Sequence, residues 1–585
     1  MKKVLFYTIL LLISNSLLIS QTFTDEASNL GIFHIYQYAF NGAGITFCDY
    51  NMDGNDDMLI PSYAGERIAI YKNNITGFQN VTSQYNISSI YESKNILVVD
   101  YDNDGDRDVF ITNVRGKIKL YQFDGQNFVD VSIQSGITND SVNATAAFWF
   151  DYNKDGLLDL YVGVYSGYLN NIPKSNRLYK NTGNGLLQDV TSASNTGNIG
   201  NKVLALAVID YNNDTWPDIY IASDRRVGNN MLRNNGNGTF TDVSAQTNTD
   251  LELDAMGLAI GDYDNNGYFD IYISNGQEGN VFLKNNGNGT FSDVTGQLGM
   301  SVNRICWGNN FFDYDNDGDL DLFICVSGGT PDRKNVLFRN NGNGTFTKIT
   351  NAGFDDNFQS YGCAIGDYDN NGYIDIATLN EGENVSLWKN SGGSNKWIKI
   401  KLQGTYSNRE GIGCLISVYR GAAKFIRYVN CGQSYCSQNS LLQTYGVGNV
   451  SIIDSIVVNW PSGAVNSVTF INVNQTITII EPNPIGIGNN QTEIINSYEL
   501  YQNYPNPFNP ATIINYKLPE NSFVNLMLYD ITGKEIMTLI NEFKIRGEYS
   551  FKLDEKTTSG LSAGVYFYKL TAGNYSETKK LVLVK

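Results

Sequence analysis

The chain of 585 residues is almost free of histidine, and His34 is the only one. This excludes an HExxH zinc motif and a histidine-rich metal site. Residues 560–564 match a nucleophile elbow, but no histidine follows them, so we expect a simple turn there. The seven cysteines show no CxxC or Cys/His spacing typical of zinc. Their odd number leaves at least one thiol free or paired between molecules, and Cys414, Cys431 and Cys436 could hold one disulfide.

Positive charge and long apolar runs are also scarce. Lys and Arg number 41 against 59 Asp and Glu, which gives a net charge of −18 and argues against nucleic acid and anionic membranes as partners. Residues 1–20 carry Lys2 and Lys3, then an apolar run from Val4 to Ile13, as in a secretory signal peptide. That run is too short for a membrane anchor, and no later segment is apolar enough to span a bilayer. We therefore expect an exported chain with no transmembrane segment after signal removal.

What the chain has in abundance is one acidic loop of nine residues, repeated seven times. Each copy reads Asp, any residue, Asp/Asn, any, Asp/Asn, usually Gly, two residues, Asp. The copies start at Asp49, Asp100, Asp151, Asp210, Asp262, Asp313 and Asp367, with steps of 51, 51, 59, 52, 51 and 54 residues. A fixed period near fifty residues indicates a repeat architecture. We call these nine-residue segments the acidic loops.

Each acidic loop has the spacing of an oxygen-ligand cation site. Side chains at positions 1, 3, 5 and 9 and the backbone carbonyl at position 7 favour calcium over magnesium or zinc. Position 12 is apolar or Thr rather than the Glu of an EF-hand, so we expect loops inside a sheet. The sequence thus predicts up to seven structural calcium ions, held by Asp49, Asn51, Asp53, Asn55 and Asp57; Asp100, Asp102, Asp104, Asp106 and Asp108; Asp151, Asn153, Asp155, Leu157 and Asp159; Asp210, Asn212, Asp214, Trp216 and Asp218; Asp262, Asp264, Asn266, Tyr268 and Asp270; Asp313, Asp315, Asp317, Asp319 and Asp321; and Asp367, Asp369, Asn371, Tyr373 and Asp375.

Four short strands per period predict the blade of a β-propeller. In the fifth period, apolar or alternating segments at 257–261, 271–274, 281–283 and 291–295 are separated by the acidic loop and an Asn-Gly-Asn-Gly turn. The fourth-strand motif occurs only six times, and the last period lacks it. Phe23-Thr24-Asp25 supplies the missing copy at the other end of the chain, so we expect this strand to close the ring.

The motif DYDNDGD at 100–106 and 313–319, with the Asn-Gly-Asn-Gly-Thr-Phe turns, resembles FG-GAP/VCBS repeats. That resemblance implies a calcium-bearing propeller like those of integrin α chains and bacterial surface proteins. Residues 407–413 (SNREGIG) and 457–463 (VVNWPSG) resemble the ASPIC/UnbV domain of cartilage acidic protein-like chains, although Gln443-Thr444-Tyr445 departs from the usual His-Phe pair. Residues 503–510 (NYPNPFNP) and 528–534 (LYDITGK) resemble the type A sorting domain of type IX secretion.

These comparisons predict an all-β chain in five parts. They are a signal peptide (1–20), a seven-bladed propeller (21–392), a small β domain of ASPIC/UnbV type (393–482), a linker (483–497) and a C-terminal β-sandwich for sorting (498–585). The sorting resemblance implies contact between 498–585 and the type IX secretion machinery. It also implies secretion to, or attachment at, the outer-membrane surface of a Bacteroidetes-like bacterium.

Two functions remain open from the sequence. The first is a non-catalytic binding or adhesion module for a glycan or an extracellular protein. The alternative is a polysaccharide-active enzyme of the lyase kind, because elimination can run on Tyr, Lys or Arg without histidine. Both would use the variable loops on the face opposite the acidic loops. Candidate contact residues there are Arg225, Arg226, Trp307, the loop 165–177, the segment 332–334 and the segment 34–38, although these could equally be solvated loops without a ligand.

Overall fold

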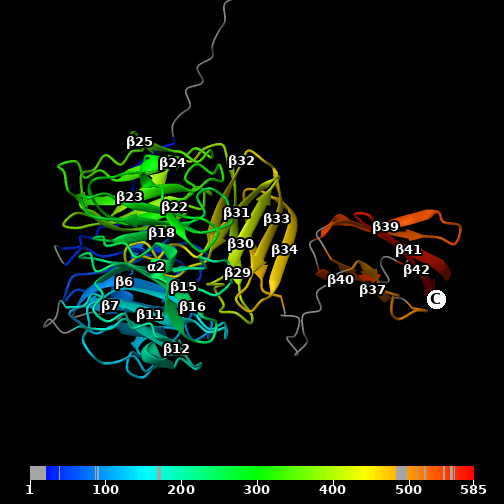
Figure 1. Cartoon of the computed structure of the whole chain (residues 1–585), viewed down its shortest axis with the longest axis horizontal. Helices are drawn as coiled ribbons and strands as arrows, with labels where there is room; N and C mark the ends of the chain where they lie inside the picture. Colours follow the sequence, from blue (N-terminus) through cyan, green and yellow to red (C-terminus); the bar gives the residue numbers. More distant parts are fainter. Residues whose placement is uncertain are drawn as a thin grey trace, which may run out of the picture. The chain divides into compact units, whose positions relative to one another are not determined.

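The structure is a computed structural model that describes residues 21–584 except 38–39, 86, 88–90, 168–172, 483–496, 510, 520–521, 545–546, 554–557 and 559. The expected signal peptide and nearly all of the expected linker therefore lie outside the described residues. The chain divides into two compact units, Met1–Ile485 and Gly486–Lys585 (Figure 1).

Strands β1 to β28 of the first unit form seven sheets of four antiparallel strands, which confirms the predicted seven blades. The first three are β2 (Thr46–Cys48), β3 (Asp57–Ile60), β4 (Ala69–Asn73) and β5 (Phe78–Asn80); β6 (Glu92–Val99), β7 (Asp108–Val114), β8 (Lys119–Phe123) and β9 (Phe128–Asp130); and β10 (Ala144–Phe150), β11 (Asp159–Val164), β12 (Arg177–Asn181) and β13 (Leu187–Asp189). Next come β14 (Val203–Ile209), β15 (Asp218–Ser223), β16 (Asn230–Asn234) and β17 (Phe240–Asp242); and β18 (Gly257–Gly261), β19 (Asp270–Ser274), β20 (Val281–Asn285) and β21 (Phe291–Asp293). The last two are β22 (Ile305–Phe312), β23 (Asp321–Gly328), β24 (Val336–Asn340) and β25 (Phe346–Ile349); and β26 (Ser360–Gly366), β27 (Asp375–Asn380) and β28 (Ser386–Asn390) with β1 (Phe23–Asp25).

Burial changes systematically across a blade. All seven residues of β14, Val-Leu-Ala-Leu-Ala-Val-Ile, are buried, as expected for a strand covered on both faces by neighbouring blades. In β17 only Phe240 is buried and the other two residues are exposed. One-turn helices follow several fourth strands: η1 (Thr82–Gln84), α1 (Thr191–Ser194), α2 (Ser244–Thr247) and α3 (Thr295–Leu298). The apolar run therefore marks the innermost strand of each blade.

Neighbouring blades are joined by a recurring asparagine at the end of the third strand. In six blades its Nδ2 donates to the carbonyl of position 2 in the acidic loop of another blade, as Asn234 does to Tyr152 at 2.8 Å. The other members are Asn73, Asn181, Asn285, Asn340 and Asn390. These amides are buried, so each bond links two blades where water cannot replace it.

The ring is closed by the N-terminal strand, as the sequence predicts. In β1, Phe23, Thr24 and Asp25 pair with Asn390, Lys389 and Trp388 of β28. The Phe23 ring stacks on Phe354 with centroids 5.0 Å apart and is only 2% exposed. The last sheet is therefore built from both ends of the repeat region.

Removing the closing strand should destabilise the whole propeller. We expect deletion of 21–30, which contains β1, to lower the free energy of unfolding far more than the loss of ten surface residues. Phe23→Ala alone should cost about 3–5 kcal/mol, because it empties a buried aromatic site. Urea unfolding measures both effects, with Phe33→Ala as the control because Phe33 is 68% exposed. A deletion variant that unfolds at the same urea concentration as the parent would contradict closure by β1.

A small β domain follows the seventh blade within the same unit, as expected. One sheet contains β32 (Gln443–Gly448), β29 (Lys396–Gln403) and β35 (Gln475–Ile480), with β29 and β35 parallel. The other contains β31 (Ala423–Tyr428), β30 (Leu415–Arg420), β33 (Ile452–Asn459) and β34 (Val465–Asn472). Buried residues of the two sheets share one core with blades two and three, among them Ile400, Val418 and Trp149.

The connection from β31 to β32 runs through the propeller, a path that was not predicted from the sequence. Residues 430–440, the axial segment, contact the first strand of every blade. The bonds or bridges are Gln438 with Phe47 and Val98; Cys431 with Trp149; Cys436 with Leu204; Ser434 with Leu258 and Asn309; and Asn439 with Ile365. First strands surround the central channel of a propeller. The axial segment therefore occupies that channel.

All seven cysteines are free and buried. The three candidates for a disulfide, Cys414, Cys431 and Cys436, are therefore unpaired. Cys431 and Cys436 are part of the axial segment, where Cys431 O accepts a hydrogen bond from Trp149 N at 3.1 Å. Cys431 and Cys436 therefore reflect packing inside the channel, and Cys414 reflects packing in the core of the small β domain, rather than a covalent bridge.

The second unit is a two-sheet β structure, in agreement with the predicted β-sandwich. Its sheets are β36 (Glu499–Leu500), β37 (Thr512–Leu518) and β40 (Gly547–Leu553); and β39 (Glu535–Lys544), β38 (Ser522–Tyr529), β41 (Gly564–Ala572) and β42 (Tyr575–Leu583). Alternate residues of β38, including Val524, Leu526 and Leu528, are buried in a core shared with Ile514 of β37. The nucleophile-elbow match at 560–564 precedes and enters β41, as a turn would.

Candidate functional site

Every acidic loop joins the first and second strands of a blade and folds in the same way. The position 1 carboxylate accepts a hydrogen bond from the N–H of position 6 in all seven loops, at 2.6–3.1 Å. The position 5 side-chain oxygen accepts the N–H of position 7 in all seven, at 2.7–3.1 Å. These bonds fix the side chains at positions 1 and 5 on a tightly turned backbone.

The fourth loop keeps this geometry although it lacks the usual glycine. Thr215 stands at position 6 with φ of 73°, a left-handed conformation that glycine adopts more easily. Its N–H still donates to Asp210 Oδ2 at 2.8 Å. The substitution therefore strains the backbone locally without opening the turn.

Carboxylates converge in four of the loops. Oxygens of positions 1, 3 and 9 lie within 4.8 Å of one another in the loops starting at Asp100, Asp262, Asp313 and Asp367. The other three loops have asparagine at position 3 (Asn51, Asn153 and Asn212), which offers an amide oxygen instead. The position 5 carboxylates Asp104 and Asp317 do not belong to these groups, so three of the five predicted ligands meet in each.

Burial disfavours the charged form of several of these carboxylates. Burial raises the pKa of Asp100 to about 7 and that of Asp108 to about 9, with nearby carboxylates adding to the shift. Asp100 Oδ1, Asp264 Oδ1 and Asp315 Oδ1 are buried and have no hydrogen-bond partner among the residues that the structure describes. Converging, buried, unpartnered carboxylate oxygens are the donor set that a hard divalent cation prefers. The residues present therefore fit calcium.

Position 9 also has a structural role. Its Oδ1 accepts an N–H from the end of the third strand in all seven blades, as Asp159 does from Asn181 at 2.8 Å. Asn181 in turn donates to Tyr101 in the preceding acidic loop. The acidic loops are thus linked to one another around the ring.

The small β domain covers the face that carries the acidic loops. Lys399 Nζ lies 2.5 Å from Asp367 Oδ2, with both side chains almost fully buried. Arg420 Nη1 donates to Asp317 O at 3.0 Å, and Gly448 N donates to Asn316 O at 2.8 Å. The domain therefore docks directly on the sixth and seventh loops, and its basic side chains face acidic ones.

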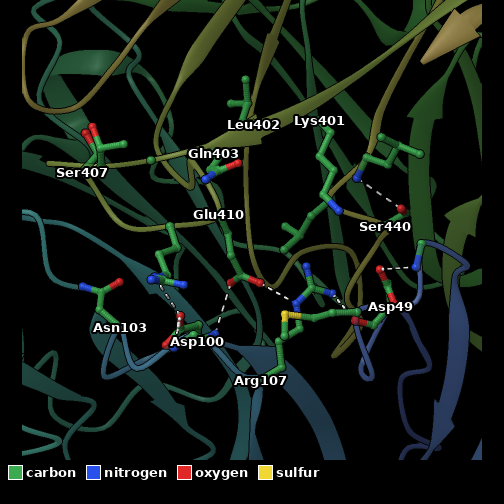
Figure 2. Close-up of a pocket in the computed structure, with 18 of the residues that line it drawn as sticks. Asp49, Asp100, Asn103, Arg107, Lys401, Leu402, Gln403, Ser407, Glu410 and Ser440 are labelled. Carbon is green, nitrogen blue, oxygen red and sulfur yellow. Dashed lines mark hydrogen bonds and ion pairs between the residues drawn. The ribbon is translucent and has the colours of Figure 1, made fainter. Parts of the chain in front are cut away.

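A cleft remains between this domain and the first three loops. Its volume is about 920 Å³, and we call it the interdomain cleft. Figure 2 shows Lys401 and Glu410 from the small β domain facing Asp49, Asp100 and Arg107 from the loops. Arg107 Nε lies 2.7 Å from Glu410 Oε1, and its Nη1 donates to Asp49 O at 2.6 Å. This cleft was not predicted from the sequence.

The residues expected to form a recognition face fall into two groups. Arg226, Asp332 and Lys334 are exposed and form ion pairs: Arg226 pairs with Glu278, Asp332 lies 3.3 Å from Arg304 Nη1, and Lys334 Nζ lies 2.9 Å from Asp355. Trp307, in contrast, is only 5% exposed: its Nε1 donates to Ser327, and its ring packs against Tyr435 of the axial segment. The expectation for Trp307 was wrong, because the axial segment covers it.

Three families match the chain, each over a separate part. The FG-GAP-like repeat matches 49–111, 100–162, 210–273, 268–324 and 313–378, which include all seven acidic loops. The family described as ASPIC and UnbV matches 404–485. The secretion system C-terminal sorting domain matches 502–585.

Relatives match about three quarters of the chain. Cartilage acidic protein 1 of Xenopus tropicalis is 23% identical over 487 residues, covering 75% of this chain and 73% of its own length. The protein of the same name from Mus musculus is 21% identical over 490 residues, with 75% and 74% covered. Among solved structures, an Agrocybe aegerita lectin that recognises non-reducing terminal N-acetylglucosamine aligns over 60% of this chain and 94% of its own, at 17% identity and a TM-score of 0.38. A TM-score of 0.38 indicates only a limited structural similarity.

The sorting domain indicates secretion to the cell surface or the outside in Bacteroidetes, with the type IX machinery as the export route. Among the residues that the structure describes, no helix is long and apolar enough to cross a membrane. The three family matches and the seven-bladed ring agree in extent and order along the sequence. The chain is a secreted or surface FG-GAP repeat protein with an ASPIC/UnbV domain and a C-terminal secretion sorting domain.

Proposed function

We propose that this protein is a calcium-stabilised, non-catalytic binding module for a glycan or an extracellular protein. The observation that carries the proposal is the closed channel. Because the axial segment touches all seven blades, the centre of the ring holds protein rather than a ligand. Recognition is left to surface loops and to the interdomain cleft, on a scaffold held rigid by inter-blade hydrogen bonds.

Calcium would serve the scaffold in this proposal. Positions 1, 3 and 9 of each acidic loop would hold the ion, with position 5 and the carbonyl of position 7 completing the set. The ion would neutralise carboxylates that burial otherwise destabilises. Lysines of the third strands pair with carboxylates of the same loops, as Lys284 does with Asp264 at position 3 (2.5 Å) and Lys72 with Asp53 at position 5 (3.1 Å).

A glycan array probed with the purified exported protein tests the binding function. We expect binding to a restricted set of glycans in millimolar calcium and its loss in chelator, because the loops that shape the surface depend on the ion. Incubation with acidic polysaccharides should give no new ultraviolet absorbance. Absorbance from unsaturated product would overturn the non-catalytic assignment and support the lyase alternative. Absence of binding to any glycan and to extracellular proteins would overturn the binding function.

A further inference from the structure

The seventh acidic loop, which starts at Asp367, differs from the others in the cations around it. A lysine from the third strand of its own blade, Lys389, lies 2.8 Å from Asp369 Oδ2 at position 3. A second lysine, Lys399 from β29 of the small β domain, lies 2.5 Å from Asp367 Oδ2 at position 1. Among the described residues, no other acidic loop has two lysine ion pairs. The seventh loop therefore receives positive charge from the propeller and from the small β domain.

The pair between Lys399 and Asp367 is shielded from water. The two side chains are only 1% and 2% exposed. Lys399 Nζ also donates to Asn370 Oδ1 of the same loop at 3.1 Å, and it lies 5.4 Å from the centroid of the Trp397 ring. A buried ammonium group is stable only while such partners compensate its loss of hydration. Lys399 therefore has to stay with this loop as long as the domain is docked.

Strand β29 is fixed against the seventh loop by neighbouring contacts. A Cβ atom at Gly372, position 6, would lie 1.9 Å from the Trp397 ring, so the strand packs on the loop where only glycine fits. Tyr373 Oη, at position 7, donates to Asn395 O at 2.7 Å. Alternate residues of a strand face the same side, which brings Lys399 onto the loop together with Trp397. The fold itself therefore places the ammonium group.

Net charge distinguishes this loop from the sixth. Its three converging carboxylates, Asp367, Asp369 and Asp375, carry three negative charges, and the two lysines leave one of them uncompensated. The sixth loop has aspartate at positions 1, 3, 5, 7 and 9, and none of these forms an ion pair with a lysine or arginine in the part of the chain that the structure describes. A divalent ion in the seventh loop would be repelled by two nearby ammonium groups. It would therefore bind there more weakly than in the sixth.

We propose that Lys399 is the counter-ion of the seventh acidic loop, so that this loop stays free of calcium when the other loops are filled. The ammonium group of the ASPIC/UnbV domain and the metal compete for the same carboxylates. The inference rests on the calcium sites of the proposed function and makes the seventh of the seven loops their exception. It also gives the docked domain an anchor on the propeller that does not depend on metal.

Counting the calcium bound to the full exported chain tests this inference. The measurement is equilibrium dialysis at ~1 mM free calcium followed by elemental analysis. An extracellular site with a Kd of about 10⁻⁴–10⁻³ M is then half to nine-tenths filled. Lys399→Met removes the charge and keeps an unbranched stem, so it should raise the bound calcium by about 0.5–0.9 ion per chain. Lys396→Met, on the same strand and partly exposed, is the matched control and should bind as much as the parent.

Removal of a carboxylate gives an independent readout that keeps Lys399 in place. Asp369→Asn, at position 3 of the seventh loop, should leave the calcium count of the parent unchanged. Asp102→Asn, at the same position of the second loop, should lower it by about 0.5–0.9 ion per chain. No lysine forms an ion pair with that second loop among the described residues, where the cation nearest to Asp100 is Arg409 at 3.7 Å. This comparison decides the question even if Lys399→Met does not fold.

Equal calcium in Lys399→Met and the parent would overturn the role of Lys399, and so would a lower count in Asp369→Asn. In either case the other loops still bind the ion, and the calcium sites of the proposed function stand. If the parent binds no calcium at all, those sites fail, and this inference fails with them.

Discussion

Stripping divalent cations from the folded protein should lower its free energy of unfolding, and by more at pH 8 than at pH 5. Extracellular calcium sites have dissociation constants of about 10⁻⁴–10⁻³ M. At ~10 mM calcium each occupied site then contributes ~1.4–2.7 kcal/mol, so four to seven sites contribute on the order of 6–19 kcal/mol. The expected loss is therefore comparable with the whole stability of a typical domain.

The pH dependence follows from the raised pKa values of the loop carboxylates. Burial raises the pKa of Asp57 to about 8, of Asp108 to about 9 and of Asp151 to about 7, against about 4 in an unfolded chain. Between the unfolded pKa of about 4 and the folded pKa values of about 7–9, the metal-free folded state binds more protons than the unfolded state. Its stability is therefore greatest at acid pH and falls as the pH rises through about 7–9. Calcium removes this penalty, so its benefit grows with pH.

Urea unfolding of resin-stripped and calcium-loaded protein at pH 5, 7 and 8.5 measures the effect. Asp108→Asn should reduce the gain in free energy of unfolding on adding calcium by about the contribution of one site. Asp124→Asn is the control, because Asp124 is exposed and lies outside the acidic loops. Magnesium should restore less than calcium, since it keeps most of its waters. A calcium increment that is absent, or that shrinks as the pH rises, would contradict metal binding by the buried carboxylates.

The second large effect is expected from a single glutamine in the axial segment. Gln438 Oε1 accepts Val98 N at 2.7 Å, and its Nε2 donates to Val98 O at 3.0 Å. Its backbone carbonyl accepts a hydrogen bond from Phe47 N at 3.0 Å, and its backbone N–H donates to Ile45 O at 3.2 Å. One fully buried residue thus joins blades one and two. Gln438→Ala removes these two side-chain partners of Val98 in the buried centre of the ring.

We expect Gln438→Ala to cost about 3–5 kcal/mol, because each unsatisfied buried group costs about 1–3 kcal/mol and a cavity adds to this. Gln475→Ala is the matched control: Gln475 is exposed on β35, and its loss should stay within about 0.5 kcal/mol. Calcium-loaded protein in a urea titration followed by fluorescence gives both values. Equal stability of the two variants would mean that the axial segment does not hold the blades together.

The ring could be predicted because each part of it is local or repeated. A period near fifty residues, apolar first strands and the acidic loops are all visible along the chain. Even the distant closure by β1 could be predicted, since Phe23-Thr24-Asp25 has the fourth-strand motif that the last period lacks. In a repeat protein, a missing copy of a motif in one period and an extra copy elsewhere in the chain predict a long-range strand pairing.

The axial segment could not be predicted in this way. Residues 430–440 show neither strand alternation nor helical periodicity, because their partners lie on seven different strands, in directions that follow no single sheet. The same is true of Trp307, whose burial depends on Tyr435 far along the chain. The cleft did leave a signal in the sequence: Asp56 and Arg107 are the two charged residues at an otherwise apolar repeat position.

The axial segment also determines how this chain can be divided. A polypeptide ending near residue 392 would contain every blade but would expose the inner face of seven apolar strands to water. Such a fragment would tend to self-associate or bind chaperones rather than behave as an autonomous module. Recombination that exchanges the ASPIC/UnbV region between related proteins would have to preserve the fit of these eleven residues in the host ring.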